Sequence, residues 1–364
     1  LEGEHRGIGV KDSYYDSNEV MAELGKVDNL DFDSIEELFE PDPSEVIESP
    51  TYRRMYNIKL EVPGKENVID AIDELLELDM VLSAEPQYIY ETVSTAISSP
   101  TSDTYYDEQW GLTGTYGIDV ETAWEIADGS GIRVGIFEGD IDTGHEDLAG
   151  RFGGSNFTPT GEEISHGTHV GGIISAVQNN NEGVAGVSKA TLYLLNGNSL
   201  KFASSLSFAI DNDIKIINAS IGYNLGDSYA PANNSHKQAI KNYGEKGGLL
   251  ICSAGNKGVN TDEIYHYPSG YGDSRLFPEI DNVISVGAIN SNGTRCSFSN
   301  YGNNSVQIYA PGSSIISTYP ASKCDDGSHN GPREGTHIAR GYHAMQGTSM
   351  AAPFVTGTAA LILS

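Results

Sequence analysis

Three short stretches of the chain carry residue types that could together perform acyl transfer. An acidic stretch at residues 138–148 (EGDIDTGHEDL) is followed by residues 165–172 (SHGTHVGG) and by residues 346–353 (QGTSMAAP). Acyl transfer needs a nucleophile, a base with a pKa near neutrality and an anion that orients the base. A serine hydroxyl is too weakly acidic to attack unaided, so an imidazole must take its proton. The order acid, histidine, serine is one in which hydrolase triads occur.

These stretches resemble signatures of the subtilase family of serine proteases. Residues 166–172 (HGTHVGG) are similar to its histidine motif and residues 347–353 (GTSMAAP) to its serine motif. The resemblance covers about residues 109–364, with further matching blocks at 217–222 (INASIG), 248–258 (GLLICSAGNKG), 283–288 (VISVGA) and 310–312 (APG). It implies a serine endopeptidase that works through an acyl-enzyme intermediate and needs no cofactor for catalysis.

The resemblance also implies a role for individual residues. Ser349 would be the nucleophile at the start of a helix, and His166 the general base. The side chain of Asn256 and the backbone N–H of Ser349 would form an oxyanion hole. Two backbone segments would pair with an extended polypeptide substrate and line its first specificity pocket: Ser220, Ile221 and Gly222, and Ser253, Ala254 and Gly255.

The acid motif departs from the family pattern of aspartate, then serine or threonine, then glycine. Alignment without gaps to the downstream H-x-D-L places Glu138 at the acid position, directly after a predicted strand. The alternative makes Asp142 the acid, within a D-T-G sequence, but it overextends that strand. We favour Glu138. A glutamate is one methylene longer than aspartate, so orienting His166 requires some local adjustment of the backbone. The alternative function is therefore a catalytically impaired pseudoprotease that binds or regulates other proteins.

A structural calcium site is a further expectation from the resemblance. Asp147 matches a ligand position of the family, and Asn179 and Asn180 lie in the oxygen-rich loop that follows the histidine helix. Oxygen donors of this kind suit a hard cation. The alternative is an asparagine-rich surface turn. His169 lies three residues after His166, which is not the spacing of a zinc pair.

Short apolar runs alternate with helical stretches from residue 109 onward. Strands are predicted at 133–137, 191–195, 214–218, 248–252, 283–286 and 306–310, and helices at 167–175, 203–211 and 235–243. Continuous apolar strands are typical of a parallel sheet that is covered on both faces. The fold class is therefore α/β, with a mostly parallel central sheet in a three-layer, subtilisin-like peptidase domain over 105–364. The end of the chain at Ser364 suggests that this domain is C-terminally incomplete.

The first hundred residues have a different pattern. A strand at 56–62, a helix at 66–78 and a short strand at 80–82 predict a small α+β domain over 1–100. Residues 94–103 are rich in serine, threonine and proline, which predicts an exposed linker near 91–104. Residues 84–88 (AEPQY) resemble the end of a subtilase pro-segment. The resemblance implies that this domain inhibits the protease as an intramolecular partner and is then removed by cleavage.

Composition excludes several classes of protein. The formal net charge is −30, so nucleic acid is an unsuitable partner. No apolar run is long enough for a transmembrane helix. Three cysteines do not make a disulfide framework. We expect a secreted or envelope-associated protein whose signal segment is not part of this chain.

Overall fold

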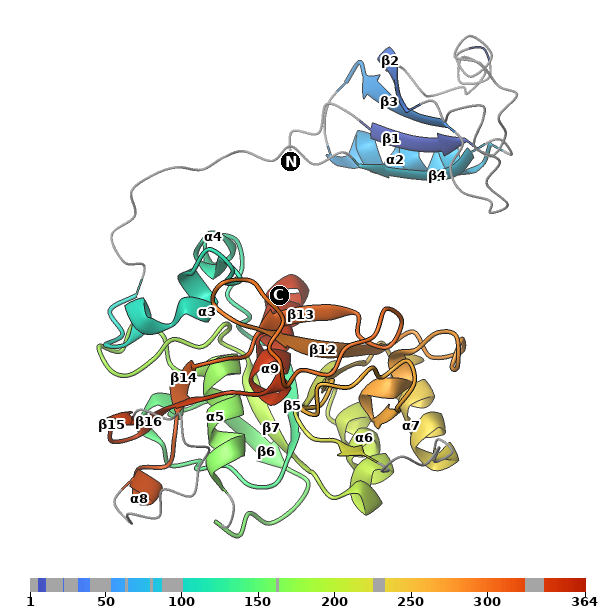
Figure 1. Cartoon of the computed structure of the whole chain (residues 1–364). Coiled ribbons are helices and arrows are strands. Elements are labelled where there is room, and N and C mark those ends of the chain that lie inside the picture. The colour runs from blue at the N-terminus through green and yellow to red at the C-terminus, as the bar shows by residue number, and fades with distance from the viewer. Residues whose placement is uncertain are drawn as a thin grey trace. The chain divides into compact units, whose positions relative to one another are not determined.

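The computed structural model describes two compact units, Leu1–Ala96 and Ile97–Ser364. Within them the described residues are 6–10, 22, 32–39, 54–62, 65–78, 81–86, 101–161, 164–224, 233–324 and 337–364. Figure 1 shows the elements of both units. Each unit is described by itself.

The first unit contains a four-stranded antiparallel sheet and one long helix. The strands β1 (Arg6–Val10), β2 (Phe32–Phe39), β3 (Arg54–Leu60) and β4 (Val81–Pro86) lie in the order β2-β3-β1-β4. Helix α2 (Lys65–Leu76) turns its apolar face onto the sheet, where Val68, Ala71 and Leu75 pack with Tyr56 and Ile58. The helix and two of the strands follow the predicted pattern. Strands β1 and β2 were not predicted, because neither has a clear apolar period.

The second unit is built on a seven-stranded sheet in which every pair is parallel. The order is β13-β12-β10-β8-β5-β7-β6, so the chain starts near the middle and winds to both edges. The strands are β5 (Arg133–Glu138), β6 (Phe152–Ser155), β7 (Thr191–Asn196), β8 (Ile216–Ala219), β10 (Leu249–Ser253), β12 (Val283–Ile289) and β13 (Ile308–Pro311). The six predicted strands are confirmed to within a few residues. Strand β6 was missed because Gly153 and Gly154 interrupt its apolar character.

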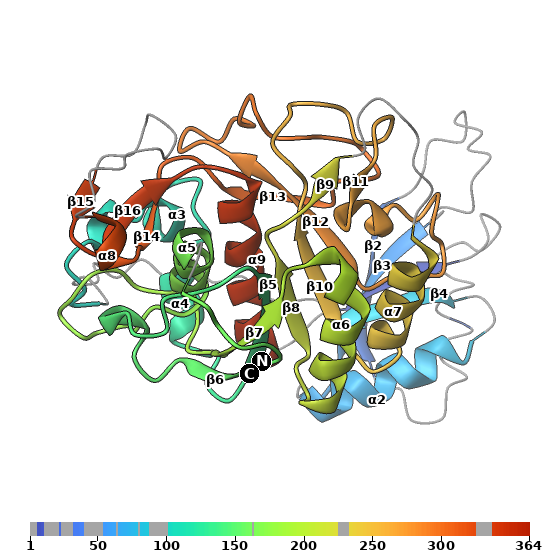
Figure 2. The same cartoon turned by 90° about the horizontal axis from the view of Figure 1, so that it is seen from below.

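Both faces of this sheet are buried, as the sequence predicts. Successive residues alternate between two cores: Val134 and Ile136 of β5 belong to one, and Phe137 belongs to the other. Helices α5 (Ile164–Ser175) and α9 (Thr348–Leu363) cover the first face, and α6 (Phe202–Asp211) and α7 (Asn234–Gly244) cover the second. Figure 2 shows α9 running beside the central strands with α5 next to it. The three-layer α/β prediction is confirmed.

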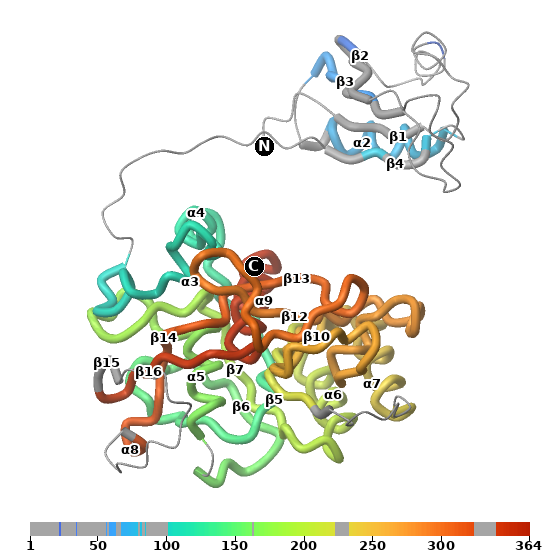
Figure 3. The backbone as a smooth tube through the Cα atoms, viewed as in Figure 1, coloured from blue at the N-terminus to red at the C-terminus, as the bar shows by residue number. Residues whose placement is uncertain are grey.

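Smaller elements complete the unit. Helices α3 (Trp110–Thr113) and α4 (Val120–Trp124) precede the sheet, and β9 (Tyr223–Asn224) pairs with β11 (His266–Tyr267). Strands β14 (Ile315–Thr318), β15 (His337–Ala339) and β16 (Tyr342–Met345) form a small sheet in the order β14-β16-β15. Figure 3 shows this sheet beside α5. The polar segment 322–340 contributes β15 and the end of α8 (Ala321–Cys324), while residues 325–336 lie outside the described part.

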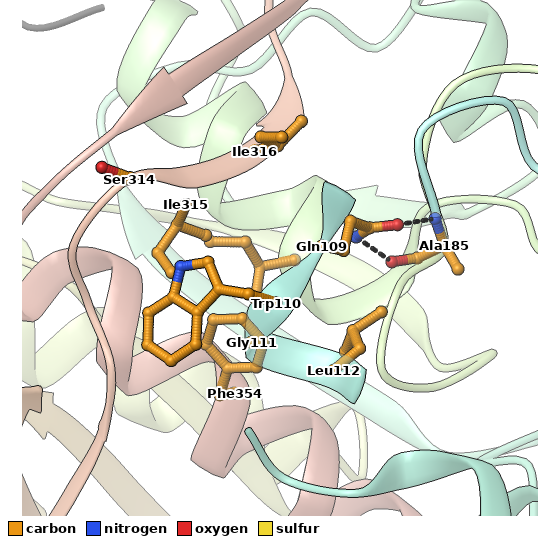
Figure 4. Close-up of a pocket in the computed structure, with 10 residues that line it drawn as sticks. Gln109, Trp110, Gly111, Leu112, Ala185, Ser314, Ile315, Ile316 and Phe354 are labelled. Carbon is orange, nitrogen blue, oxygen red and sulfur yellow. Dashed lines mark hydrogen bonds between the residues drawn. The ribbon is translucent and has the colours of Figure 1, made fainter. Parts of the chain in front are cut away.

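The end of the predicted linker is packed rather than exposed. Thr101 and Asp103 are buried, and the Asp103 carboxylate accepts the backbone N–H groups of Asn179 and Asn180 at 3.0 Å each. Nearby, both ends of the Gln109 amide bond to the backbone of Ala185, as Figure 4 shows. The exposed-linker prediction is therefore wrong for Thr101 and Asp103, because these residues anchor the start of the second unit. Residues 87–100 lie outside the described part.

Candidate active site

The topology brings the candidate residues to one edge of the parallel sheet. Glu138 is the last residue of β5, Ser220 directly follows β8, and Asn256 lies three residues after β10. These three strands are neighbours, and the carboxyl ends of parallel strands meet at one edge. His166 and Ser349 lie in the first turns of α5 and α9, which pack against each other.

Glu138 holds the imidazole of His166. The Oε2 of Glu138 lies 2.9 Å from Nδ1 of His166, and the side chains are 6% and 37% exposed respectively. The negative charge of Glu138 raises the pKa of His166 against the opposing effect of burial. This contact orients the ring and leaves Nε2 as the nitrogen that could accept a proton.

Neither nearby aspartate competes for this histidine. Asp142 Oδ1 accepts the backbone N–H of Gly144 at 3.1 Å. Asp140 is buried, and its Oδ2 accepts the N–H groups of Thr160 and Gly161 at 2.6 Å each, which fixes the loop after β6. The geometry thus favours Glu138 over the alternative Asp142 as the partner of His166.

Ser349 and Ser220 are joined by two hydrogen bonds. The Oγ of Ser349 donates to the carbonyl oxygen of Ser220 at 3.0 Å, and the Oγ of Ser220 donates to the carbonyl oxygen of Ser349 at 2.7 Å. Asn218 and Thr356 extend this buried network, since Asn218 Nδ2 donates to Ser220 Oγ and Thr356 Oγ1 donates to Asn218 Oδ1, both at 2.9 Å. Among the described residues, the Ser349 hydroxyl has no hydrogen bond to His166, so a rotation of its side chain is needed to reach the base.

Pro353 explains why the Ser349 carbonyl is available. Helix α9 begins at Thr348, so Pro353 lies in its second turn, and an ordinary residue there would donate its N–H to the carbonyl of Ser349. Because proline has no N–H, this carbonyl lacks its helical partner, and Ser220 Oγ supplies the bond instead.

Asn256 is oriented by Thr348. The side-chain oxygen of Asn256 accepts both the backbone N–H and the Oγ1 of Thr348, at 2.8 and 2.9 Å. In turn, Thr348 Oγ1 accepts the backbone N–H of Gly255 at 3.0 Å. These bonds occupy the amide oxygen of Asn256 and leave its Nδ2, on an exposed side chain, without a hydrogen bond in the described part of the chain. Thr348 was not predicted as a functional residue, although its place beside Ser349 was a usable signal.

The two predicted substrate segments face each other across His266. A Cβ added to Gly222 would collide with the His266 ring, and one added to Gly255 would lie 2.9 Å from His266 Nε2. Gly222 and Gly255 therefore both pack against the same imidazole ring, which brings the two segments together.

One part of the substrate prediction is wrong. The N–H groups of Ala254 and Gly255 bond to Val286 O and Thr348 Oγ1, and their carbonyls accept bonds from Asn300. This second segment is already paired within the fold, so it can line a pocket but is not free to pair with a substrate strand.

The residues predicted to bind calcium are bonded to nitrogen donors. Asp147 is fully buried, with Asn180 Nδ2 at 2.8 Å from Oδ1 and Val184 N at 2.9 Å from Oδ2. The side-chain oxygens of Asn179 and Asn180 accept the N–H groups of Ser102 and Glu182. Among the described residues no cluster of three metal-ligating His, Cys, Asp or Glu side chains occurs. As arranged, these groups do not fit a calcium shell, and the calcium site stays a prediction.

Other histidines near the site are structural. Nε2 of the fully buried His169 lies 3.0 Å from the carbonyls of Ile315 and His343, and burial lowers its pKa to about 3. His145 bonds to Gly341 O and to Asp147 N. Both ring systems bond to backbone groups.

Comparison with known proteins identifies the family. The model of the subtilase family matches residues 129–364, which is more than half of the chain. The chain belongs to the subtilase family. It is 34% identical over 265 residues to thermitase of Thermoactinomyces vulgaris, covering 69% of this chain and 81% of that protein. It is 33% identical over 270 residues to subtilisin DY of Bacillus licheniformis, covering 69% and 85%.

Two further proteins extend the likeness. A thermophilic serine proteinase of Bacillus sp. strain AK1 is 30% identical over 321 residues, covering 84% of this subtilase and 68% of that protein. A solved structure of a protease from Pseudoalteromonas arctica superposes with a TM-score of 0.57 at 25% identity, covering 72% and 87%. This subtilase is therefore a subtilisin-like serine endopeptidase with polypeptide substrates. None of its described helices is long and apolar enough to cross a membrane.

Proposed function

We propose that this subtilase hydrolyses peptide bonds with Ser349 as nucleophile, His166 as general base and Glu138 as the acid that orients the base. The observation that carries the proposal is the 2.9 Å contact between Glu138 and His166, at the sheet edge that also holds Ser349. Asp142, the alternative acid, is bonded to Gly144 instead.

In the proposed reaction the Ser349 hydroxyl turns from Ser220 O toward Nε2 of His166. The imidazole takes the hydroxyl proton as Ser349 Oγ forms a bond to the substrate carbonyl carbon. His166, now cationic beside Glu138, then gives that proton to the leaving amine, and the peptide C–N bond breaks. Water repeats the two steps on the acyl-enzyme and releases the acid product.

The developing negative charge has two candidate donors. Asn256 Nδ2 is free because Thr348 holds the amide oxygen, and the Ser349 backbone N–H lies in the first turn of α9, where it has no helical partner. Donors fixed before the reaction stabilise an oxyanion without reorganisation.

The rival function is a pseudoprotease, suggested by the glutamate at the acid position. A fluorophosphonate probe separates the two, because it labels only an activated serine. We expect labelling of the native chain and none of Ser349→Ala, and an unlabelled native chain at neutral pH would favour the pseudoprotease.

We further propose that residues 1–100 act as an inhibitory pro-segment, removed by cleavage between residues 91 and 100, and that the protein is secreted or envelope-associated. The support is the separate α+β unit and the resemblance of residues 84–88. Because Thr101 and Asp103 are buried, we propose the cut before them. The full chain should lose this unit on incubation, whereas Ser349→Ala should remain uncut.

A further inference from the structure

The buried histidine between the two substrate segments has no role in the chemistry described above. His266 is 3% exposed and lies on β11, which pairs with β9 directly after Gly222. Its ring occupies the space next to the missing side chains of Gly222 and Gly255. Any side chain that enters between residues 220–222 and 253–255 therefore meets this ring.

The ring directs one nitrogen into that space. Nδ1 lies 2.8 Å from Ser269 Oγ. Nε2 is the atom that a Cβ on either glycine would approach, and it has no hydrogen bond among the described residues. His266 Nε2 does not occur among the described side-chain atoms that are fully buried and lack a partner, so solvent or a ligand can reach this nitrogen and complete its bonding.

Ser269 lets the ring take either tautomer or a positive charge. Its hydroxyl can donate to Nδ1, or it can accept from Nδ1 and donate to His266 O at 3.3 Å. A ligand that accepts hydrogen bonds can therefore select the form that carries the proton on Nε2.

The surrounding charge indicates which acceptor is best. Burial lowers the pKa of His266 to about 4, and the positive charge of the exposed Lys257 acts in the same direction. The positive charge of Lys257, which disfavours a second proton on the His266 imidazole, also attracts an anion. Hydrogen bonds to charged groups are stronger than those between neutral ones.

We propose that His266 determines specificity at the residue whose carbonyl is attacked, by donating from Nε2 to the carboxylate of a glutamate or aspartate side chain. This inference rests on the proposed function and names its substrate class: polypeptides that are cut after acidic residues.

The test uses the full chain after self-processing and five peptides that differ only before the scissile bond, where they carry Glu, Gln, Ala, Phe or Lys. We expect kcat/KM for Glu to exceed that for Gln about tenfold, or about 1.4 kcal/mol. In His266→Ala that ratio should fall toward one while the Ala peptide is still cut. His266→Asp should reverse the preference, favouring a Lys peptide over the Glu peptide.

A matched control is His236→Gln, which replaces another buried histidine, one bonded to Ser199 O and packed on Phe202. This variant should keep the native ratio. Equal cleavage of Glu and Gln peptides by the native enzyme, with a separate sample of it shown to be labelled by the fluorophosphonate, would overturn the specificity proposal alone. So would an unchanged ratio in His266→Ala. Absence of both labelling and cleavage would overturn the endopeptidase mechanism as well.

Discussion

Ser220 Oγ donates to the carbonyl oxygen of Ser349 at 2.7 Å, while Ser349 Oγ donates to the carbonyl oxygen of Ser220 at 3.0 Å. The first bond fixes the start of α9, and the second holds the Ser349 hydroxyl on Ser220 rather than on His166. In the proposed reaction this hydroxyl turns to His166, which would leave Ser220 O free to accept an N–H from an extended substrate. Substrate binding and activation of the serine would then be linked through one carbonyl group.

The Ser220 side chain should matter for stability. Ser220→Ala leaves the Ser349 carbonyl without the bond that Pro353 denies it, so we expect the free energy of unfolding to fall by about 1–3 kcal/mol. Urea unfolding on a Ser349→Ala background measures this without self-digestion. The exposed Ser207, bonded only to the carbonyl of Ala203, is a matched serine-to-alanine control. Equal stabilities would mean that the bond contributes nothing.

Removal of the acid tests the assignment of Glu138. We expect Glu138→Ala to lower kcat on the order of 10⁴-fold, by analogy with the acid of subtilisin, and Asp142→Ala to keep most of the activity. Steady-state cleavage of one peptide by both variants gives the answer. If only Asp142→Ala abolishes cleavage, the assignment is wrong.

The pH dependence follows from the Glu138–His166 contact. Because the carboxylate raises the pKa of His166, the base becomes protonated as the pH falls through that raised pKa, and kcat/KM should fall with it. Glu138→Gln removes the anion, so the midpoint of the acidic limb should move to lower pH while the maximum rate drops. A pH profile with an unmoved midpoint would show that another group controls the limb.

Asn256 is the proposed oxyanion-hole donor, and Thr348 is the residue that orients its side chain. Asn256→Leu is expected to lower kcat about 10²–10³-fold with little change in KM, the effect of losing one oxyanion donor in subtilisin. Thr348→Val removes the hydroxyl between Gly255 N and Asn256 but keeps its backbone bond, so it should lower kcat less, again with KM nearly unchanged. Should Thr348→Val raise KM instead, the threonine acts on substrate binding.

Asp147 should make stability depend on pH. Burial raises its pKa to about 6, so the folded chain binds a proton there that the unfolded chain, with an ordinary value near 4, binds only at lower pH. Its contribution is present below about pH 4 and is lost as the pH rises through 6, on the order of 2–3 kcal/mol.

Urea unfolding of the native protein and Asp147→Asn, each on a Ser349→Ala background with a chelator, measures this loss. The native-minus-variant difference should become less favourable from pH 4.5 to pH 7.5. Repeating the series with calcium tests the predicted metal site, because a bound cation would reverse the change.

Much of the fold could be read from the sequence because its signals are local. Apolar runs such as residues 133–137 and 191–195 need burial on both faces, and only a parallel sheet between helices gives it. Strand β6 and strands β1 and β2 lack such runs, and their pairing depends on partners far away in the chain. Asp103 was assigned to the linker because the residues that it contacts, 179–180, also lie far from it in the sequence.

The candidate site was predictable in its residue types but not in its bonds. His166 and Ser349 are marked by dense motifs, and Glu138 was found only by counting from H-x-D-L. No sequence pattern predicts that Thr348 donates hydrogen bonds to the Asn256 side-chain oxygen. None predicts that the His266 ring packs beside Gly222 and Gly255. Such contacts join positions 92 or more apart or depend on the absence of a side chain.

Pro353 determines how the start of helix α9 is connected to the end of strand β8. Because Pro353 has no N–H, the Ser349 carbonyl has no hydrogen bond within its own helix. It accepts one from Ser220 instead, which directly follows strand β8. If a peptide binds at residues 220–222 as proposed, a displacement of Ser220 would act on the Ser349 backbone through this hydrogen bond. A residue with a backbone N–H at position 353 would donate to the Ser349 carbonyl within helix α9. Ser220 and Ser349 would then not be joined through this carbonyl.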